Sequence, residues 1–153
     1  MTIVFEPIGI IHTPFKKLKG IPIQPRFARN FSGTVDIKPE LVEGLADLDG
    51  FSHIILIYYL HLSKAYSLKV IPYLDDTPRG VFATRAPRRP NQIGLSVVRL
   101  DKIEGATLFI RDVDIIDGTP LLDIKPYVPD FEPGEKFKMG WLEEKIDKNN
   151  GRS

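Results

Sequence analysis

The chain has 153 residues and a formal net charge of +1, a length that suits one domain with its own hydrophobic core. Its composition, 42% hydrophobic and 27% charged, excludes a disordered chain, and the absence of cysteine excludes disulfides, thiol catalysis and cysteine-ligated zinc. We expect a cytoplasmic protein, since no signal peptide is visible and the longest apolar run, residues 54–60, is too short to span a membrane.

Proline and glycine punctuate the sequence every several residues, which favours short strands joined by turns over long helices. The first part predicts an opening strand over residues 3–11 that is interrupted at Pro7, and a second strand over 33–38. Residues 39–44 predict one helical turn, with proline at its start and glycine at its end. Residues 52–61 are rich in β-branched and aromatic side chains, which favours a strand buried on both faces, although periodicity alone does not exclude a helix.

The second part of the chain predicts further strands, over residues 68–73, 80–83, 95–100, 106–111 and 112–116. Glu104-Gly105 is a typical hairpin turn, and Asp117-Gly-Thr-Pro120 would end the last of these strands. These elements predict a mostly-β, single-domain β-barrel with short helical turns. The domain would span residues 1–145, and residues 146–153 would form a flexible tail.

One predicted loop is rich in arginine. The run Ala83-Thr-Arg-Ala-Pro-Arg-Arg-Pro-Asn-Gln-Ile-Gly94 is restricted by two prolines and a closing glycine. Arginine offers a rigid fork of donors that suits carboxylates and phosphates. A ligand site and a solvated basic turn would both account for the pattern. Residues 12–29 also contain basic side chains and no acid, so a nearly neutral chain can still present a basic face.

A second segment alternates acids with apolar residues: Asp112, Asp114, Asp117 and Asp123. On a strand, Asp112 and Asp114 would share one face, whereas Asp117 would bond its own backbone in a turn. Carboxylates could hold a hard cation, but their spacing fits no EF-hand loop, and turn chemistry accounts for Asp117 at least as well. We therefore expect no metal.

The third segment carries histidines. His53 and His61 are eight residues apart, so on a strand they would face the same side, and His61 would reach the rim where the apolar run ends. The sequence contains no dinucleotide-binding glycine fingerprint, P-loop, nucleophile elbow or zinc-protease motif. A doubly wound nucleotide-binding domain is therefore not expected.

The phrases "GFSHIILIYYLH", "GVFATRAPRRPNQIGLS" and "DGTPLLDIKPY" together resemble the TrmO family, also called TsaA-like, of S-adenosylmethionine-dependent tRNA methyltransferases. The similarity runs from Ile8-Gly-Ile-Ile-His-Thr-Pro-Phe15 to Asp123-Ile-Lys-Pro-Tyr127, which is most of the chain. It implies a β-barrel that forms a homodimer, with S-adenosylmethionine bound near the subunit interface. It also implies methyl transfer to N6 of N6-threonylcarbamoyladenosine, beside the anticodon of a tRNA substrate.

The resemblance further implies which residues form the site. The cofactor-binding residues would be Ile23, Gln24, Pro25, His61, Leu62, Arg85, Leu95, Asp114, Ile115, Ile116 and Asp117. The candidates for contacts with RNA phosphates are Arg26, Arg29, Arg88 and Arg89. Asp117 and His61 are the candidates for a catalytic base, because the acceptor nitrogen is conjugated with a carbonyl and needs help to lose its proton.

The sequence departs from the family pattern at two places. It has Asn91-Gln92-Ile93 where the family commonly has Asn-Pro-Ile, and it stops soon after Trp141, whereas longer bacterial members continue into a second domain. Two other interpretations stay open beside the tRNA methyltransferase. One is a methyltransferase that acts on another RNA or a small substrate, and the other is a non-catalytic module that binds a nucleoside or S-adenosylmethionine.

Overall fold

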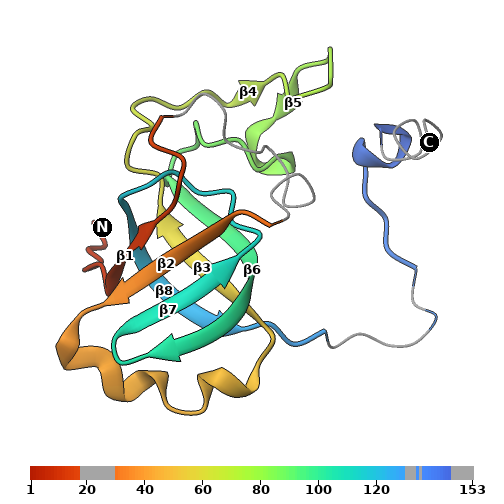
Figure 1. Cartoon of the computed structure of the whole chain (residues 1–153). Coiled ribbons are helices and arrows are strands. Elements are labelled where there is room, and N and C mark those ends of the chain that lie inside the picture. Colours follow the sequence, from red (N-terminus) through yellow and green to blue (C-terminus); the bar gives the residue numbers. More distant parts are fainter. Residues whose placement is uncertain (18–29, 130–133, 135, 146–153) are drawn as a thin grey trace.

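The computed structural model describes residues 1–17, 30–129, 134 and 136–145 (Figure 1). Its main element is a closed antiparallel barrel in the order β1-β2-β7-β6-β3-β8. The barrel strands are β1 (Gly9–His12), β2 (Ser32–Ile37), β3 (His53–Tyr59), β6 (Ile93–Glu104), β7 (Thr107–Arg111) and β8 (Thr119–Pro126). A two-stranded ribbon, β4 (Lys69–Val70) and β5 (Arg79–Gly80), stands outside the barrel. The predicted mostly-β barrel with short helical turns is confirmed.

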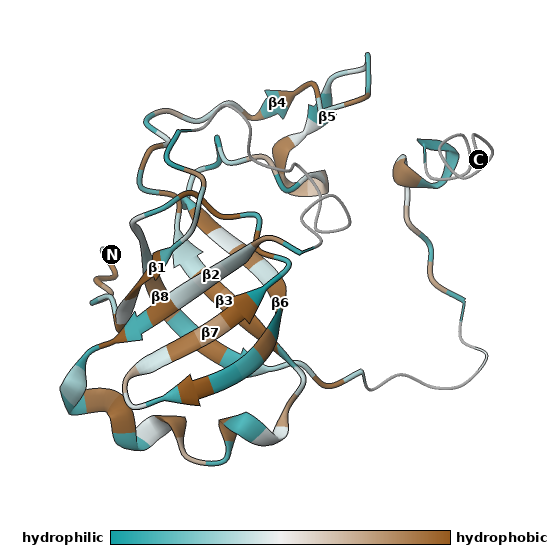
Figure 2. Ribbon diagram, in the orientation of Figure 1, coloured by the Kyte–Doolittle hydropathy of each residue, from teal (hydrophilic) through white to brown (hydrophobic). Residues whose placement is uncertain are grey.

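The alternation of side chains along each strand places the core inside the barrel. In β3, Ile54, Leu56 and Tyr58 are buried, whereas Ile55 and Ile57 between them are only half-buried. The prediction that this strand is buried on both faces is therefore wrong for its outer face. A closed barrel has a single packed interior, so only one face of each strand can line it. Figure 2 shows brown stretches interspersed with pale and teal ones along the barrel strands.

Two helical turns lie between β2 and β3, at one end of the barrel, and the sequence predicted only the first of them. The 3-10 helix η2 (Pro39–Leu45) begins with a proline, as the pattern predicts, and η3 (Leu48–Gly50) follows it. The hairpin turn at Glu104-Gly105 also forms, because Gly105 adopts a φ of +61° between β6 and β7. Among the described residues, no helix has both the length and the apolar character to cross a membrane.

Three strand predictions are wrong. Residues 3–5 are exposed and lie outside any strand, and β1 begins only at Gly9. Residues 81–83 form the 3-10 helix η4 (Val81–Ala83), which turns the buried Val81 side chain inward.

Residues 112–116, predicted as a strand, instead form an irregular connection. Asp112 has a φ of +63°, which ends the extended backbone, and its Oδ1 accepts a hydrogen bond from the backbone N–H of Asn30 at 3.0 Å. The predicted shared strand face of Asp112 and Asp114 is therefore wrong. The turn that was expected to end this strand instead leads directly into β8.

Strand direction determines which loops meet. Since every neighbouring pair is antiparallel, the ends of β1, β3 and β7 lie at the same end of the barrel as the starts of β2, β6 and β8. The connections β1–β2, β3–β6 and β7–β8 therefore begin and end here, and we call their described residues, 13–17, 30–31, 60–92 and 112–118, the upper rim. Figure 1 shows β4, β5 and the β7–β8 connection at the upper rim, with the two helical turns at the other end. Every predicted site residue that the structure describes belongs to the upper rim or to the first residues of β6.

Candidate functional site

A carboxylate and two hydroxyl groups form a buried polar chain below the upper rim. Ser96 Oγ donates a hydrogen bond to Asp114 Oδ1 at 2.8 Å, and Tyr58 Oη lies 2.8 Å from the same Ser96 Oγ. Burial raises the pKa of the Asp114 carboxyl group, while the Ser96 hydrogen bond and the charge of Arg85 act in the opposite direction. Burial, with the nearby charge of Asp114, raises the pKa of Tyr58 to about 12. The structure thus gives Asp114 a buried partner, Ser96, and behind it Tyr58, neither of which the sequence analysis identified.

Arg85, on the exposed arginine-rich loop, acts electrostatically on this group of hydrogen-bonded side chains. Its positive charge lowers the pKa values of both Asp114 and Tyr58, so its guanidinium lies within electrostatic reach of them. No ion pair within 4.0 Å involves Arg85 in the described part of the chain. The two predicted cofactor-binding residues Arg85 and Asp114 thus lie near each other, and the Arg85 guanidinium forms no ion pair with a carboxylate of the described residues.

The other two arginines of the loop differ from each other. Arg89 Nη1 donates to the carbonyl oxygens of Thr84 and Ala86 at 3.0 and 3.1 Å, so this side chain holds its own loop in shape. The side chain of Arg88 is exposed and makes no hydrogen bond or ion pair with the described residues. Of the two candidates for RNA phosphates, Arg88 is the one whose guanidinium is available.

The segment that carries His61 lies against the arginine-rich loop. The backbone N–H of Leu60 donates to the carbonyl of Gln92 at 2.8 Å, and Ser63 Oγ donates to the carbonyl of Pro87 at 3.1 Å. His61 lies beyond the end of β3, so the prediction that it shares a strand face with His53 is wrong. Its Nδ1 is buried and has no hydrogen-bond partner among the described residues. A buried ring nitrogen without a partner is costly unless a ligand or water satisfies it.

The remaining apolar candidates differ in exposure. Leu62 and Leu95 are 43% and 47% exposed. The side chains of Ile115 and Ile116 are buried, and their carbonyl oxygens accept hydrogen bonds from the hydroxyls of Thr13 and Thr119 at 2.6 and 2.7 Å. The two leucines therefore offer apolar surface to a ligand, whereas the two isoleucines lie beneath the rim.

Asp117 lies three residues from Asp114 but has different partners. Its carboxylate accepts hydrogen bonds from the backbone N–H of Thr13 at 3.0 Å and from Lys16 Nζ at 2.8 Å, and His12 Nδ1 lies 3.5 Å away. The Lys16 hydrogen bond is the main reason why the pKa of Asp117 is lowered. Asp117 therefore joins the β1–β2 connection to the β7–β8 connection.

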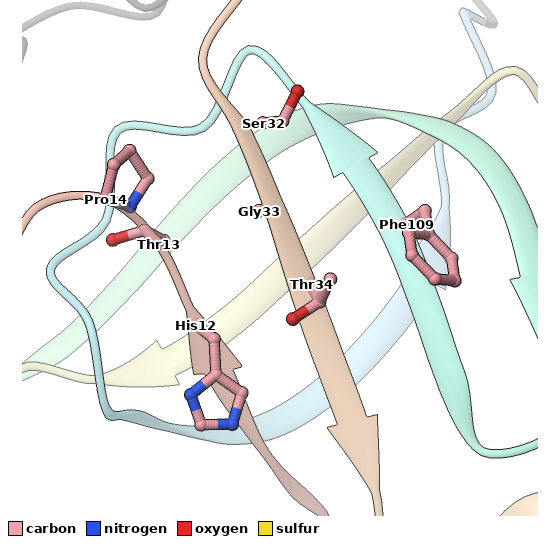
Figure 3. A pocket seen from close by; sticks show the side chains of 7 residues that line it. All are labelled: His12, Thr13, Pro14, Ser32, Gly33, Thr34 and Phe109. Carbon is pink, nitrogen blue, oxygen red and sulfur yellow. The ribbon is translucent and has the colours of Figure 1, made fainter.

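His12 also borders a hollow on the outer wall of the barrel. Figure 3 shows His12, Thr34 and Phe109 projecting from the neighbouring strands β1, β2 and β7. The hollow has a volume of about 350 Å³ and lies on the outer wall beside the rim. His12 Nε2 is held there at 3.1 Å from Asp36 Oδ2. Within the described ranges, no group of three or more histidine, aspartate or glutamate side chains is arranged to hold a metal ion.

The C-terminal segment contacts the rim at the outer ribbon. Trp141 Nε1 donates to the carbonyl of Ala83 at 2.8 Å, and the Arg79 guanidinium lies 5.5 Å from the centre of the Trp141 ring. Lys145 Nζ and Arg79 Nε also bind the two carboxylate oxygens of Asp75, at 3.3 and 2.9 Å. Trp141 and Lys145, which follow the last barrel strand in sequence, thereby contact the outer ribbon and the start of the arginine-rich loop.

Comparison with known proteins identifies the relatives of this chain. Residues 10–133 match the family described as the tRNA-methyltransferase O N-terminal domain. The chain belongs to this family. The tRNA-methyltransferase O resemblance stated from the sequence is thus confirmed.

Three relatives place the chain within the tRNA-methyltransferase O family. A Pyrococcus abyssi protein named as a probable S-adenosyl-L-methionine-binding protein is 57% identical over 97% of this chain and 80% of its own length. The mouse tRNA (adenine(37)-N6)-methyltransferase is 37% identical over 88% of this chain, which corresponds to 33% of the mouse enzyme. The crystal structure of TrmO from Pseudomonas aeruginosa superposes with a TM-score of 0.76 and 39% identity, over 92% of this chain and 63% of that chain.

The departure from the family pattern at Gln92 leaves the loop's main-chain contact in place. The carbonyl oxygen of Gln92 is the group that accepts from Leu60, and a proline would offer the same carbonyl. The predicted residues Ile23, Gln24, Pro25, Arg26 and Arg29 lie outside the described residues.

Tyr58 and Ser96 were missed, although the sequence held a signal for them. Alternation along β3 and β6 places both among inward-facing apolar residues, where a hydroxyl group requires a partner. The sequence could therefore have identified these two hydroxyl groups as candidates, although not the carboxylate to which Ser96 donates.

Proposed function

We propose that this protein is an S-adenosylmethionine-dependent methyltransferase that methylates N6 of N6-threonylcarbamoyladenosine beside the anticodon of a tRNA. Family membership and the names of the relatives support methyl transfer to tRNA. The observation that carries the proposal is the pairing, at one rim, of the exposed Arg85 with the half-buried carboxylate of Asp114. Opposite charges that do not neutralise each other directly are suited to a ligand that carries both charges.

The described residues fit the methyl donor. S-adenosylmethionine supplies an electrophilic methyl group on a sulfonium, together with an amino acid end and an adenosine end. Arg85 would bind the carboxylate of the amino acid end, because a guanidinium fork matches a carboxylate. Asp114 would accept hydrogen bonds from the amine, the ribose hydroxyls or the adenine amino group. Leu62 and Leu95 would offer apolar contact, and His61 lies beside them with an Nδ1 atom that no described residue engages.

The acceptor nitrogen requires a base, and His61 is better suited to this role than Asp117. Two hydrogen-bond donors already occupy the Asp117 carboxylate, and its lowered pKa makes it a weak base. His61 has a free ring nitrogen at the rim. Most of the rate enhancement would come from holding the acceptor in line with the methyl group, for which the braced rim is suited.

The rim also offers features that suit RNA. Arg88 presents an uncommitted guanidinium to phosphates, and Arg26 and Arg29 remain candidates by sequence alone. Phe15 and Phe31 form an edge-to-face pair with ring centres 5.0 Å apart, and Phe31 is 40% exposed. An exposed aromatic ring beside basic residues can stack on an unpaired base of the anticodon loop.

We further propose that the protein is a cytoplasmic homodimer. Large apolar side chains are exposed along the segment from the end of β3 to the start of β6: Tyr59, Leu62, Tyr66, Leu68, Ile71, Tyr73, Leu74, Phe82, Ile93 and Leu95. Figure 2 shows brown patches along this segment, around β4 and β5. Such a concentration of apolar surface is typical of a surface that a partner covers. Sedimentation of the purified protein would test the dimer, and a monomer at micromolar concentration would contradict it.

The function can be tested with labelled S-adenosylmethionine and two tRNA pools, one that carries the threonylcarbamoyl modification and one that lacks it. We expect label transfer only to the modified pool. Transfer to both pools would favour a different acceptor, and binding without any transfer would favour a non-catalytic module. No cofactor binding by calorimetry would refute both methyltransferase interpretations.

Arg85→Ala tests the cofactor assignment directly. We expect it to weaken S-adenosylmethionine binding by ~1.5–3 kcal/mol, the range for a hydrogen bond to a charged group. Arg99→Ala is a matched control, because Arg99 is another exposed arginine and lies on the outer wall of β6. Unchanged affinity in a folded Arg85→Ala protein would remove Arg85 from the site.

A further inference from the structure

Tyr58 and Ser96 form a polar pair where the barrel would otherwise be apolar. The two residues are 8% and 2% exposed, and they line the barrel interior with Leu56 and Val98. A pair of buried hydroxyl groups gives a fold little net stability, since two apolar residues of similar shape would serve as well. The pair therefore calls for a role other than packing.

The hydrogen-bond pattern fixes the direction of the protons. A hydroxyl group has one proton, and that of Ser96 is donated to Asp114 Oδ1. Ser96 can then only accept from Tyr58, so the Tyr58 proton must point toward Ser96. Both protons are thus aligned toward one carboxylate oxygen, and hydrogen bonds aligned in this way strengthen each other.

Strand register supports the same arrangement. Tyr58 lies opposite Gly94, and Leu56 lies opposite Ser96, in the antiparallel pair of β3 and β6. A Cβ atom at Gly94 would be 2.3 Å from Cε2 of the Tyr58 ring, so only glycine leaves room for this ring position. The backbone of β6 is therefore fitted to the place where Tyr58 reaches Ser96.

We propose that Tyr58 and Ser96 are positioning residues of the cofactor site, which hold the Asp114 carboxylate ionised and aimed at a hydrogen-bond donor or cationic group of the methyl donor. This inference rests on the proposed function, because that function supplies the ligand of Asp114. Burial alone raises the pKa of Asp114 and favours its neutral form, and the Ser96 hydrogen bond opposes this effect. Arg85 and Tyr58 are the other titratable groups that act on this carboxyl group in the described chain.

Two measurements test the inference in Ser96→Ala, Ser96→Thr and Tyr58→Phe. The first follows the side-chain carboxyl carbon of Asp114 by NMR during a pH titration of the ligand-free protein. The second measures S-adenosylmethionine affinity by calorimetry across the same pH range. Thr107→Val is the matched control, since Thr107 Oγ1 also donates to an aspartate, Asp36, at 3.0 Å, but near the opposite end of the barrel.

We expect Ser96→Ala to raise the Asp114 midpoint and to weaken the affinity about tenfold or more at neutral pH. Ser96→Thr should restore both values, because it keeps the hydroxyl group. Tyr58→Phe keeps the ring in place, and it should shift both values less than Ser96→Ala. Thr107→Val should change neither.

The inference would be overturned if Ser96→Ala changed neither the Asp114 midpoint nor the affinity. If the serine variant does not fold, the same result in Tyr58→Phe would overturn it. Failure of the proposed function has a different signature. In that case the wild-type protein itself binds no S-adenosylmethionine, while the Asp114 midpoint still rises in Ser96→Ala. Such a result overturns the assignment to a cofactor site and retains only the link from Ser96 to Asp114.

Discussion

Gly94→Ala is the substitution whose cost follows most directly from the coordinates. The added methyl group would lie 2.3, 2.6 and 2.9 Å from Cε2, Cζ and Cδ2 of the Tyr58 ring. The ring is 8% exposed and packed in the core, so it can move only by straining its neighbours. Overpacking of this kind costs ~1–3 kcal/mol. Displacing the ring also breaks its bond with Ser96, which adds about 1 kcal/mol.

We therefore expect Gly94→Ala to lower the free energy of unfolding by about 2–4 kcal/mol, measured by chemical denaturation. Gly80→Ala is the matched control, since Gly80, at the end of β5, has a φ of −59° and an added Cβ would meet no atom within 4 Å. Its stability should stay within about 0.5 kcal/mol of the wild type. If Gly94→Ala were as stable as Gly80→Ala, the close contact between β6 and the Tyr58 ring would be refuted.

Two more predictions concern the rim. Arg89→Ala removes both hydrogen bonds by which this side chain holds the loop of residues 80–94. It should lower the free energy of unfolding by ~1–2 kcal/mol and speed proteolysis of that loop. Equal proteolysis of Arg89→Ala and Arg88→Ala would contradict this. The lowered pKa of Asp117 predicts a stabilisation that is present above the ordinary aspartate pKa of about 3.9 and lost as the pH falls toward the lower value in the folded protein. In Lys16→Met, the free energy of unfolding should fall less steeply at acid pH than in the wild type. The difference should be no more than ~1 kcal/mol, since Lys16 is largely exposed. The same fall in both proteins would exclude Lys16 as its cause.

The sequence predicted the barrel because its signals are local. Alternation within β2 and β6 and the turn at Glu104-Gly105 depend on neighbouring residues, and the structure contains these elements. The irregular Asp112–Ile116 connection could not be predicted in this way. Its backbone turns at Asp112, where the carboxylate is held by the N–H of Asn30, a residue 82 positions away. A non-local contact therefore overrode an alternating pattern that is otherwise typical of a strand.

The buried polar chain shows a second limit of local patterns. Periodicity places Tyr58 and Ser96 inside the barrel, but only the register of β3 with β6 brings their hydroxyl groups together. The third member, Asp114, comes from a connection between two other strands. None of the three residues stands out in its own segment. They form a site only because closure of the barrel brings the ends of separate strands together.

Asp114 and Asp117 show most clearly what the structure adds to the pattern. In sequence they are two acids three residues apart in one segment, both predicted to bind the cofactor. In the structure, burial raises the pKa of Asp114, whereas the Lys16 hydrogen bond lowers that of Asp117. Carboxylates whose environments shift their pKa values in opposite directions are suited to different roles. Asp117 is committed to holding two rim connections together, whereas the Asp114 carboxylate, which accepts from Ser96 and lies within reach of the charge of Arg85, is left for the ligand.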